Sequence, residues 1–507
     1  MATLETKIEK LSPIARSIEA NPPDDRLREL ARHHERTTEF GSPSFVTEVR
    51  ARSAKDTRNT VDGQLTEADM EVIREVREYL RGKDLIQVDR TMGRGDHPND
   101  YACRLFVSSD FARLALMFDA SLRPPHPGKW DEPDFITVDV PDWPGERAIL
   151  VDPLEGITYV LASDYYGEIK KSFLRQAMFR AKQEGRLGLH AGSKQVRVRG
   201  ADGKLHTHGM LFFGLSGTGK TSLTCHSFNL EAEEGVHVRQ DDVVLLDRNG
   251  RAFGTEGGGF YIKTEGLSPE DQAALFSAAV SPTAILENVW VAEDGTVDFH
   301  NTRLTGNGRA VVRISEVRNT DGNIDLERAD KIFFITRNGL CPAACKLTPE
   351  QAAVAFMLGE SIKTSAADPN AKGEPVRVVG TNPFIVGPPG EEGDIFYEIL
   401  QANPDIECYL VNTGGVGEGA SKVDIKILDT VRILTEIARN VVDWTADEST
   451  GLQIPRHIDG VAPTKFRVAD HYSAAELEER LREQRRARDQ WLDRFPSFDE
   501  KLKSAVY

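Results

Sequence analysis

A glycine-rich segment of eight residues constrains the fold of this chain more than any other feature. Residues 214–221 read Gly-Leu-Ser-Gly-Thr-Gly-Lys-Thr and fit the pattern G-x-x-x-x-G-K-[ST]. The apolar run 210–213 precedes the segment, and residues compatible with a helix follow Thr221. A buried strand should therefore end at Gly214 and a helix should begin near Lys220, which places the segment in an α/β sheet structure.

The chemistry of this segment is that of a phosphate site. Glycines let the backbone turn tightly and direct its N–H groups at phosphate oxygens. Lys220 would reach the β- and γ-phosphates of a nucleotide, and the Thr221 hydroxyl would bind Mg²⁺. The predicted nucleotide-binding residues of the loop are Gly214, Leu215, Ser216, Gly217, Thr218, Gly219, Lys220 and Thr221.

A phosphate loop usually works with an acidic residue elsewhere that holds the metal. Asp241 and Asp242 lie about 20 residues beyond the loop, directly before the apolar run 243–246. Asp247 directly follows that run and is a rival by the strand-then-Asp rule. Spacing alone leaves both alternatives open.

The rest of the chain is organised around further short apolar runs. A length of 507 residues predicts two large domains, or two lobes that flank a cleft. The first 40 residues are charged, and we expect them to form a peripheral, helical arm. Ser473 and Glu476 predict a capped helix near the C-terminus, whose charged residues would form a solvated face. Strands are expected at 105–107, 135–140, 148–151, 210–213, 243–246, 331–335 and 408–411, and a long irregular loop at 366–394.

Composition excludes several classes of protein. The net charge of −17 argues against broad binding to nucleic acid or to an anionic membrane. The five cysteines are scattered and odd in number, which suits a reducing cytoplasm, and Cys341 and Cys345 lack a second pair that would complete a zinc site. No signal peptide and no membrane span is apparent. We expect a cytoplasmic monomer or small homo-oligomer that binds neither nucleic acid nor membrane.

Several further motifs occur in one order along residues 45–440, and together with the loop they resemble ATP-dependent phosphoenolpyruvate carboxykinases. Collinearity of so many short motifs is far more specific than any one of them. The motifs are Arg52-Ser53-Ala54-Lys55-Asp56, Tyr165-Tyr166-Gly167-Glu168-Ile169-Lys170-Lys171, His190, Asp241-Asp242, Glu256-Gly257-Gly258-Gly259-Phe260-Tyr261-Ile262-Lys263-Thr264, Leu286-Glu287-Asn288-Val289, Asn301-Thr302-Arg303 and Tyr409-Leu410-Val411-Asn412-Thr413-Gly414.

The resemblance implies a reaction in which oxaloacetate and ATP give phosphoenolpyruvate, CO₂ and ADP, as in gluconeogenesis. Decarboxylation leaves an enolate, whose oxygen attacks the γ-phosphate. The resemblance also implies a fold with an N-terminal α/β domain (41–186) and a C-terminal P-loop domain (187–507). That second domain would hold a mixed sheet and end in a helical extension from about residue 470, with the active site in the cleft between the domains.

The same resemblance assigns the site residues. Lys171, His190 and Asp242 would hold Mn²⁺ on the substrate side, which favours Asp242 over Asp247, and Mg²⁺ would accompany ATP. A lysine ligates only as the neutral amine, so nearby cations such as Lys170 would have to lower its pKa. The remaining roles fall to Arg52 and Tyr165, which would hold the dicarboxylate, to Arg303, which would bridge substrate and γ-phosphate, and to Lys263, which would lie near the phosphates.

The chain departs from the family pattern at several places. Ala54 stands where the family has Pro, and Val-Val-Leu-Leu follows Asp242 in place of Glu-His-Gly-Trp. The family's nucleotide-contacting Arg would fall at Asp424, or at Lys422 in a shifted register. Another phosphoryl donor is therefore one alternative. A second is a kinase of the same lineage, resembling HPr kinases, that acts on another acid or a protein, and a third is a regulator without catalysis.

Overall fold

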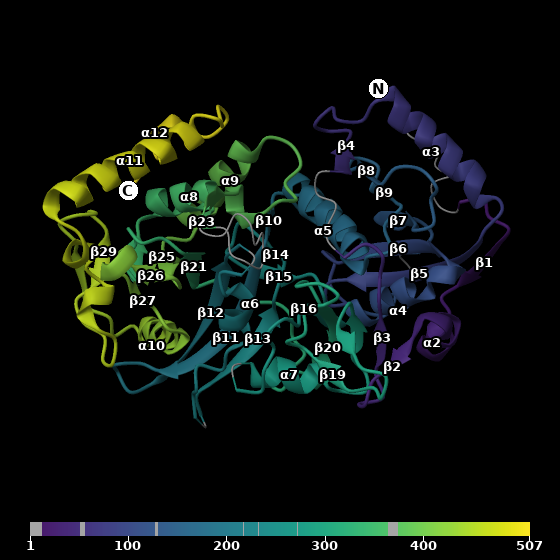
Figure 1. Cartoon of the computed structure of the whole chain (residues 1–507). Helices are drawn as coiled ribbons and strands as arrows, with labels where there is room; N and C mark the ends of the chain where they lie inside the picture. Colours follow the sequence, from purple (N-terminus) through teal and green to yellow (C-terminus); the bar gives the residue numbers. More distant parts are fainter. Residues whose placement is uncertain are drawn as a thin grey trace.

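The computed structural model describes residues 13–50, 56–126, 130–215, 217–231, 233–270, 272–362 and 374–507. It confirms a mixed α/β structure with several mixed sheets. Figure 1 shows the elements of the first third of the chain on one side of the molecule and those of the last third on the other. Helix α5 and strands β10 and β14 lie between them. None of the described helices is long and apolar enough to cross a lipid bilayer.

The N-terminal sheet has seven strands in the order β1-β5-β6-β7-β9-β8-β4. Strands β6, β7 and β9 run parallel, whereas β5–β6 and β8–β9 are antiparallel pairs. The strands are β1 (Ser17–Ala20), β4 (Thr57–Asn59), β5 (Asp84–Met92), β6 (Tyr101–Ser108), β7 (Phe135–Val140), β8 (Ala148–Asp152) and β9 (Ile157–Leu161), and the associated helices are α2 (Asp24–Ala31), α3 (Glu67–Leu80), α4 (Ala112–Ser121) and α5 (Tyr166–Gln183).

The described part of the predicted N-terminal arm belongs to this sheet. Strand β1 pairs in parallel with β5, and Leu27 and Ala31 of α2 are buried, with α2 packed on α4. The prediction of a peripheral arm is therefore wrong for residues 13–40, because their few apolar side chains complete the core. Helix α3 begins at Glu67 with a reciprocal capping box between Thr66 and Asp69.

The C-terminal sheet has eight strands in the order β13-β11-β12-β21-β25-β22-β29-β28. Its centre is parallel, since β21 pairs in parallel with both β12 and β25, and its flanks are antiparallel. The strands are β11 (Ala191–Arg199), β12 (Leu205–Phe213), β13 (Gly235–Gln240), β21 (Lys331–Thr336), β22 (Ala344–Leu347), β25 (Glu407–Asn412), β28 (Trp444–Ala446) and β29 (Gln453–Pro455).

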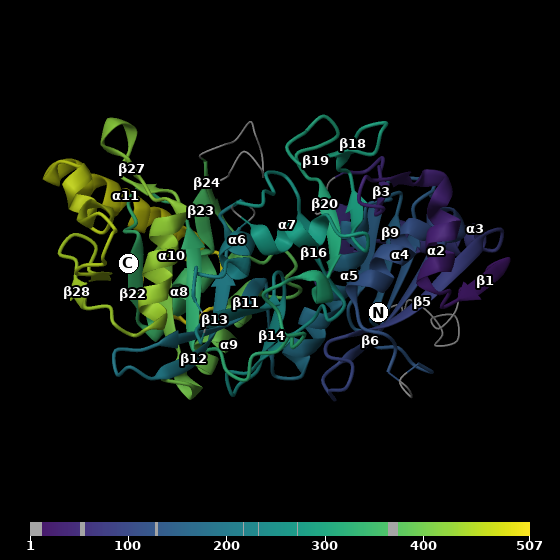
Figure 2. The same cartoon turned by 90° about the horizontal axis from the view of Figure 1, so that it is seen from below.

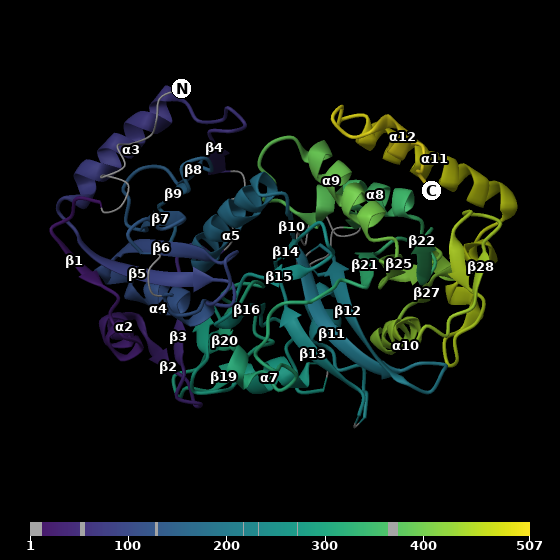
Figure 3. The same ribbon diagram turned by 180° about the vertical axis from the view of Figure 1, so that it is seen from behind.

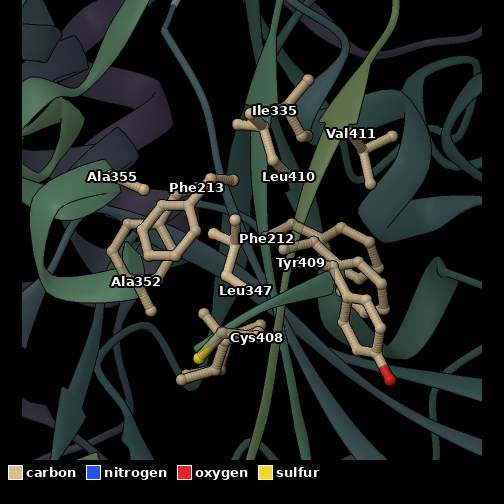
Figure 4. Packing of buried hydrophobic residues seen from close by; sticks show 14 of the residues in the cluster. Phe212, Phe213, Ile335, Leu347, Ala352, Ala355, Cys408, Tyr409, Leu410 and Val411 are labelled. Carbon is tan, nitrogen blue, oxygen red and sulfur yellow. The ribbon is translucent and has the colours of Figure 1, made fainter. Parts of the chain in front are cut away.

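An aromatic ladder stabilises the centre of this sheet. Phe212, Phe333 and Tyr409 occupy one register across β12, β21 and β25, and their rings stack with centroids 5.0 and 5.2 Å apart. Figure 4 shows Phe212 and Tyr409 within the buried cluster around these strands. Phe213 stacks on Phe334 in the same way, at 5.1 Å. The parallel core thus holds the ends of β12, β21 and β25 in fixed relation, and these ends carry the phosphate loop and its neighbours.

Smaller sheets link the two halves. The order β16-β20-β17-β3-β2 joins strands from the start and middle of the chain, and β10-β14-β15 forms a three-stranded sheet. In Figure 2, β16, β20 and α7 lie between α6 and helices α4 and α5. The bounds are β2 (Arg36–Thr37), β3 (Pro43–Phe45), β10 (Leu187–Leu189), β14 (Val244–Leu246), β15 (Ala252–Gly254), β16 (Gly259–Lys263), β17 (Ile285–Glu287), β20 (Arg309–Arg313), α6 (Lys220–Cys225) and α7 (Ala273–Ala279), with two-stranded ribbons β18 (Trp290–Val291) with β19 (Val297–Asp298), β23 (Glu360–Ile362) with β24 (Pro375–Arg377) and β26 (Gly415–Val416) with β27 (Val423–Asp424).

Helices α8 (Pro349–Leu358), α9 (Pro389–Ala402), α10 (Ile427–Ala438), α11 (Ala474–Leu492) and α12 (Glu500–Lys503) complete the chain. The irregular loop predicted for 366–394 is partly wrong, because Pro389 begins α9, where a proline at the first helical position is well tolerated. Helix α11 begins after Ser473 as predicted, and it lies with α12 over α8 (Figure 3). The charged face predicted for α11 is not wholly exposed to solvent, since Arg488 of this helix is buried.

Candidate active site

The phosphate loop connects β12 to α6. Gly219 precedes the helix with a φ of 103°, a conformation that glycine adopts without strain. At Gly214 a Cβ atom would lie 2.6 Å from the Thr218 hydroxyl, so a side chain there would obstruct the turn. The Thr413 hydroxyl, at the end of β25, donates to the Thr218 carbonyl at 2.7 Å and anchors the loop. Ser216 lies outside the described residues.

Asp242 is the centre of the cluster that faces this loop. Its Oδ1 atom lies 3.2 Å from Lys220 Nζ and 3.0 Å from His190 Nε2. Its Oδ2 atom lies 3.1 Å from Lys170 Nζ and contacts the ammonium of Lys171. Residues from α5, the β10–β11 junction, the start of α6 and the end of β13 thus converge on one carboxylate.

The rival aspartate occupies a turn. Asp247 Oδ1 accepts hydrogen bonds from the backbone N–H groups of Asn249 and Arg251, both at 2.9 Å. This is the ordinary role of an aspartate after a strand. Geometry therefore brings Asp242, and not Asp247, to Lys220, which makes Asp242 the candidate for the acidic residue of the phosphate loop.

The charges of the cluster alter the pKa values of its members. Burial would raise the pKa of Asp242, but the ammonium groups of Lys170, Lys171 and Lys220 hold it well below its usual range. Burial lowers the pKa of Lys171 to about 8, with the Lys170 charge acting in the same direction and Asp242 opposing it. The neutral amine of Lys171 is therefore accessible near neutral pH.

Lys170 has the opposite character. Burial would lower its pKa, but Asp242 and Glu256 outweigh burial and raise it. Glu256 Oε1 lies 2.9 Å from Lys170 Nζ, and burial raises the pKa of Glu256 to about 7. Lys170 thus remains an ammonium group beneath the cluster and keeps positive charge beside Lys171.

His190 lies between the Thr381 carbonyl and Asp242. Burial, together with the charge of Lys220, lowers the pKa of His190 to about 4, so the ring is neutral at pH 7. Its Nδ1 lies 2.7 Å from the Thr381 carbonyl and its Nε2 lies 3.0 Å from Asp242 Oδ1; both oxygens can only accept, whereas the neutral ring carries one proton. When that proton is on Nδ1, the Nε2 lone pair faces Asp242 and is available to a cation.

This arrangement fits a divalent cation. With the His190 proton on Nδ1, the Nε2 lone pair and the Asp242 carboxylate are two electron-pair donors that a cation between them would join. Lys171 adds a third donor whose amine can lose its proton. No group of three or more His, Cys, Asp and Glu residues suited to a metal occurs among the residues described here, so such a site depends on the lysine.

Tyr165 lies at the N-terminus of α5 with two polar neighbours that sequence reasoning missed. Asn307 Nδ2 lies 3.1 Å from the Tyr165 hydroxyl. Arg309 is partly buried in the same region, where its guanidinium lies 5.5 Å from the Tyr261 ring centre. Burial would lower the pKa of Arg309, but the neighbouring groups, Tyr165 foremost, raise it. Asn307 and Arg309 lie a few residues after the Asn301-Thr302-Arg303 motif, and this proximity is the one sequence signal that could have suggested them.

Two predicted residues do not contact the cluster. The Arg303 side chain is exposed and lies over the Trp290 ring at 5.4 Å. The Lys263 ammonium pairs with Glu265. Arg52 falls outside the described residues. Thr221 is partly exposed on the first turn of α6, directly after Lys220.

Known proteins match this chain over most of its length. A family model described as phosphoenolpyruvate carboxykinase matches residues 16–464. A protein of Aeropyrum pernix named phosphoenolpyruvate carboxykinase (ATP) is 35% identical over 446 residues, which cover 88% of each chain. Proteins of the same name from Rhizobium rhizogenes and Staphylococcus aureus are 28% and 29% identical, covering 76% and 80% of this chain and 71% and 77% of their own. Helices α11 and α12 lie beyond the family match.

Proposed function

The chain belongs to the ATP-dependent phosphoenolpyruvate carboxykinase family, and from this premise we propose that it converts oxaloacetate and ATP to phosphoenolpyruvate, CO₂ and ADP. The family assignment confirms the resemblance seen in the sequence motifs, and the chain is an enzyme of this class. The observation that carries the proposed mechanism is the meeting of Lys171, His190 and Lys220 at Asp242.

The proposed division of labour follows from charge. The reaction develops negative charge on the enolate oxygen and on the transferring phosphoryl group. Lys220, at the end of the phosphate loop, binds the β- and γ-phosphates. It lies within 3.2 Å of Asp242, so nucleotide phosphate and substrate meet at this cluster. The cluster is buried, which strengthens each electrostatic interaction and keeps water from the reactive enolate.

The donor set would hold Mn²⁺ through the Lys171 amine, the His190 Nε2 atom and the Asp242 carboxylate. Thr221 would contribute its hydroxyl to the Mg²⁺ that accompanies ATP. When bound, these cations supply Lewis-acid stabilisation of the developing oxyanions. A hydrogen bond from His190 Nδ1 to the Thr381 carbonyl would set the tautomer that the cation requires, and Lys170 keeps its proton and so favours the neutral amine of Lys171.

Substrate binding is assigned to the residues around α5. The Tyr165 hydroxyl and the Arg52 guanidinium would hold the dicarboxylate, since a guanidinium matches a carboxylate with two parallel hydrogen bonds. Arg303 would approach the γ-phosphate when both ligands are present, and Lys263 would lie near the phosphates. Both side chains are at least partly exposed, so they are free to turn toward a bound nucleotide.

The wider assignments are also part of the proposal. The chain would comprise a substrate-side domain (41–186) and a P-loop domain (187–507) with the active site between them. It would act in the cytoplasm in gluconeogenesis, with small molecules as its ligands. The central position of α5, β10 and β14 between the two halves supports this division (Figure 1).

An assay of phosphoenolpyruvate formation from oxaloacetate, MgATP and Mn²⁺ tests the function. Lys220→Met and His190→Ala should each lower kcat/KM by at least about 100-fold, because each removes a group at the reacting charge. His206→Ala is the control, since His206 lies at the start of β12 with a half-exposed side chain that pairs with Asp202. Unchanged turnover in Lys220→Met would contradict the proposal.

The choice of substrates separates the alternatives. Product formed with GTP or pyrophosphate but not with ATP would retain the chemistry and change the donor. Phosphorylation of another acid or of a protein, without turnover of oxaloacetate, would favour the HPr-kinase-like alternative.

A further inference from the structure

The carboxyl ends of three parallel strands meet beside the phosphate loop. Strand β12 leads into the loop at Gly214, β21 ends at Thr336, and β25 leads to Thr413. The Thr413 N–H donates to the Thr336 carbonyl at 2.9 Å, and its hydroxyl donates to the Thr218 carbonyl of the loop at 2.7 Å. In open α/β sheets ligands bind at this carboxyl edge.

Arg337 is the first residue beyond β21 at this edge. Its backbone N–H donates to the Ser361 hydroxyl at 3.2 Å, which fixes the start of the side chain. A Cβ atom on Gly414 would lie 3.1 Å from Arg337 Cβ and 3.2 Å from Cγ, so the stem packs against the bare backbone there. The side chain is thus held at the strand end that neighbours the loop.

The Arg337 guanidinium has no partner in the described part of the chain. Its Nε atom is buried without a hydrogen bond, and no carboxylate forms an ion pair with it. The residue as a whole is only partly buried, so its terminal nitrogens remain open to solvent. An unmet buried donor is destabilising, and an anion bound to the guanidinium would offset part of that cost.

The neighbouring cation is already neutralised. Lys422 lies 2.7 Å from Asp424, and both side chains are largely exposed on the segment around β27. Unlike Lys422, Arg337 has an aliphatic stem that is held by packing, and it has no acidic partner among the described residues. A guanidinium fork of this kind matches phosphate oxygens with paired hydrogen bonds.

We propose that Arg337 binds the phosphate chain of the nucleotide held by the 214–221 loop. The inference rests on the proposed function and adds to it a phosphate contact that neither the loop pattern nor the motif order assigns. Arg337 would approach the phosphates from the end of β21, while Lys220 approaches them from α6.

Calorimetric titration with MgATP tests this contact in the full chain. Arg337→Met should weaken MgATP binding at least tenfold, and Arg337→Lys should restore part of the loss, since it keeps the charge without the fork. Arg328→Met is the matched control, because Arg328 precedes β21 at its opposite end and is half-exposed. It should change the affinity by less than twofold.

Two further ligands identify the part of the nucleotide that is bound. Magnesium tripolyphosphate should lose affinity for Arg337→Met by the same factor as MgATP, whereas adenosine should not. A loss for MgATP without a loss for tripolyphosphate would overturn the phosphate contact and indicate stacking on the base. A loss in Lys422→Met but not in Arg337→Met would also overturn it.

Failure of the inference is distinguishable from failure of the proposed function. If Lys220→Met abolishes MgATP binding while Arg337→Met and Arg337→Lys bind as the unmodified protein does, only the inference is overturned. If Lys220→Met also binds normally, the proposed function is contradicted as well. If Arg337→Met folds poorly, Arg337→Lys is tested in its place. Weaker binding of tripolyphosphate but not of adenosine would then support the contact, and unchanged binding of tripolyphosphate would overturn it.

Discussion

Replacing Glu360 with Gln should destabilise the protein by about 3 kcal/mol or more at pH 7, because this buried carboxylate joins the C-terminal helices to the central sheet. Its Oε1 atom lies 2.7 Å from Arg488 of α11, and its Oε2 atom lies 2.6 Å from Arg377. The Arg488 guanidinium also donates to the carbonyl of Tyr507. Glutamine would leave two buried guanidinium groups without an anion.

The magnitude follows from the pKa of Glu360. Burial would raise this pKa, but Arg488 and Arg377 outweigh burial and lower it from 4.5 to about 2. Each unit of pKa corresponds to about 1.36 kcal/mol, so the lowering of the Glu360 pKa corresponds to about 3 kcal/mol of folding stability. Removing one partner of a buried ion pair typically costs about 3–5 kcal/mol, which agrees.

Thermal unfolding at several pH values measures this effect. With an unfolding entropy of about 2.1 cal/mol/K per residue, about 3 kcal/mol lowers the Tm of a chain of this length by about 3 °C. Because the folded pKa is depressed, the stabilisation is complete above about pH 4.5 and is lost as the pH falls through about 2. The gap between Glu360→Gln and the unmodified protein should therefore narrow as the pH falls below about 4.5.

Glu478→Gln is the matched control. Glu478 forms an i,i+4 pair with Arg482 on α11, but both side chains are exposed, so its loss should cost less than about 0.5 kcal/mol. Equal Tm values for Glu360→Gln and Glu478→Gln at pH 7, or a gap that widens as the pH falls below 4.5, would refute the reasoning.

Two further predictions concern the substrate side and the sheet. Tyr165→Phe should raise the KM for oxaloacetate roughly tenfold with little change in Tm, because the lost hydroxyl bonds to Asn307 and Arg309, which are both only partly buried. A steady-state titration checks this, and an unchanged KM would argue against substrate contact. Glu407→Gln should lower stability by about 2–3 kcal/mol in urea unfolding, since Glu407 pairs with the buried Lys331 and with Lys346 and its pKa is lowered to about 2. Because the folded pKa is depressed, this loss should shrink as the pH falls from about 4.5 toward 2.

Local patterns predicted the elements that depend on neighbouring residues. The 210–213 run lies in β12, and the runs 331–335 and 408–411 lie in β21 and β25. The capping residue Ser473 located the start of α11 correctly. These predictions succeed because a hydrophobic run or a cap acts within a few residues of itself.

Contacts between distant residues set the limit of prediction. The Thr381 carbonyl reaches His190 across 191 positions, and no local signal marks it. Strand β1 was missed because its pattern is exposed and short, and only pairing with β5 defines it. The cluster at Asp242 was predicted from motif order, whereas Asn307 and Arg337 required the sheet topology.

Binding of Mn²⁺, followed by electron paramagnetic resonance, tests the central claim most directly. The account predicts one tight Mn²⁺ site per chain and a loss of affinity of at least about 30-fold in both His190→Ala and Asp242→Asn, because each removes a direct ligand. Thr221→Val should leave this substrate-side site intact. Mn²⁺ affinity that is the same in the unmodified protein, His190→Ala and Asp242→Asn would contradict the account.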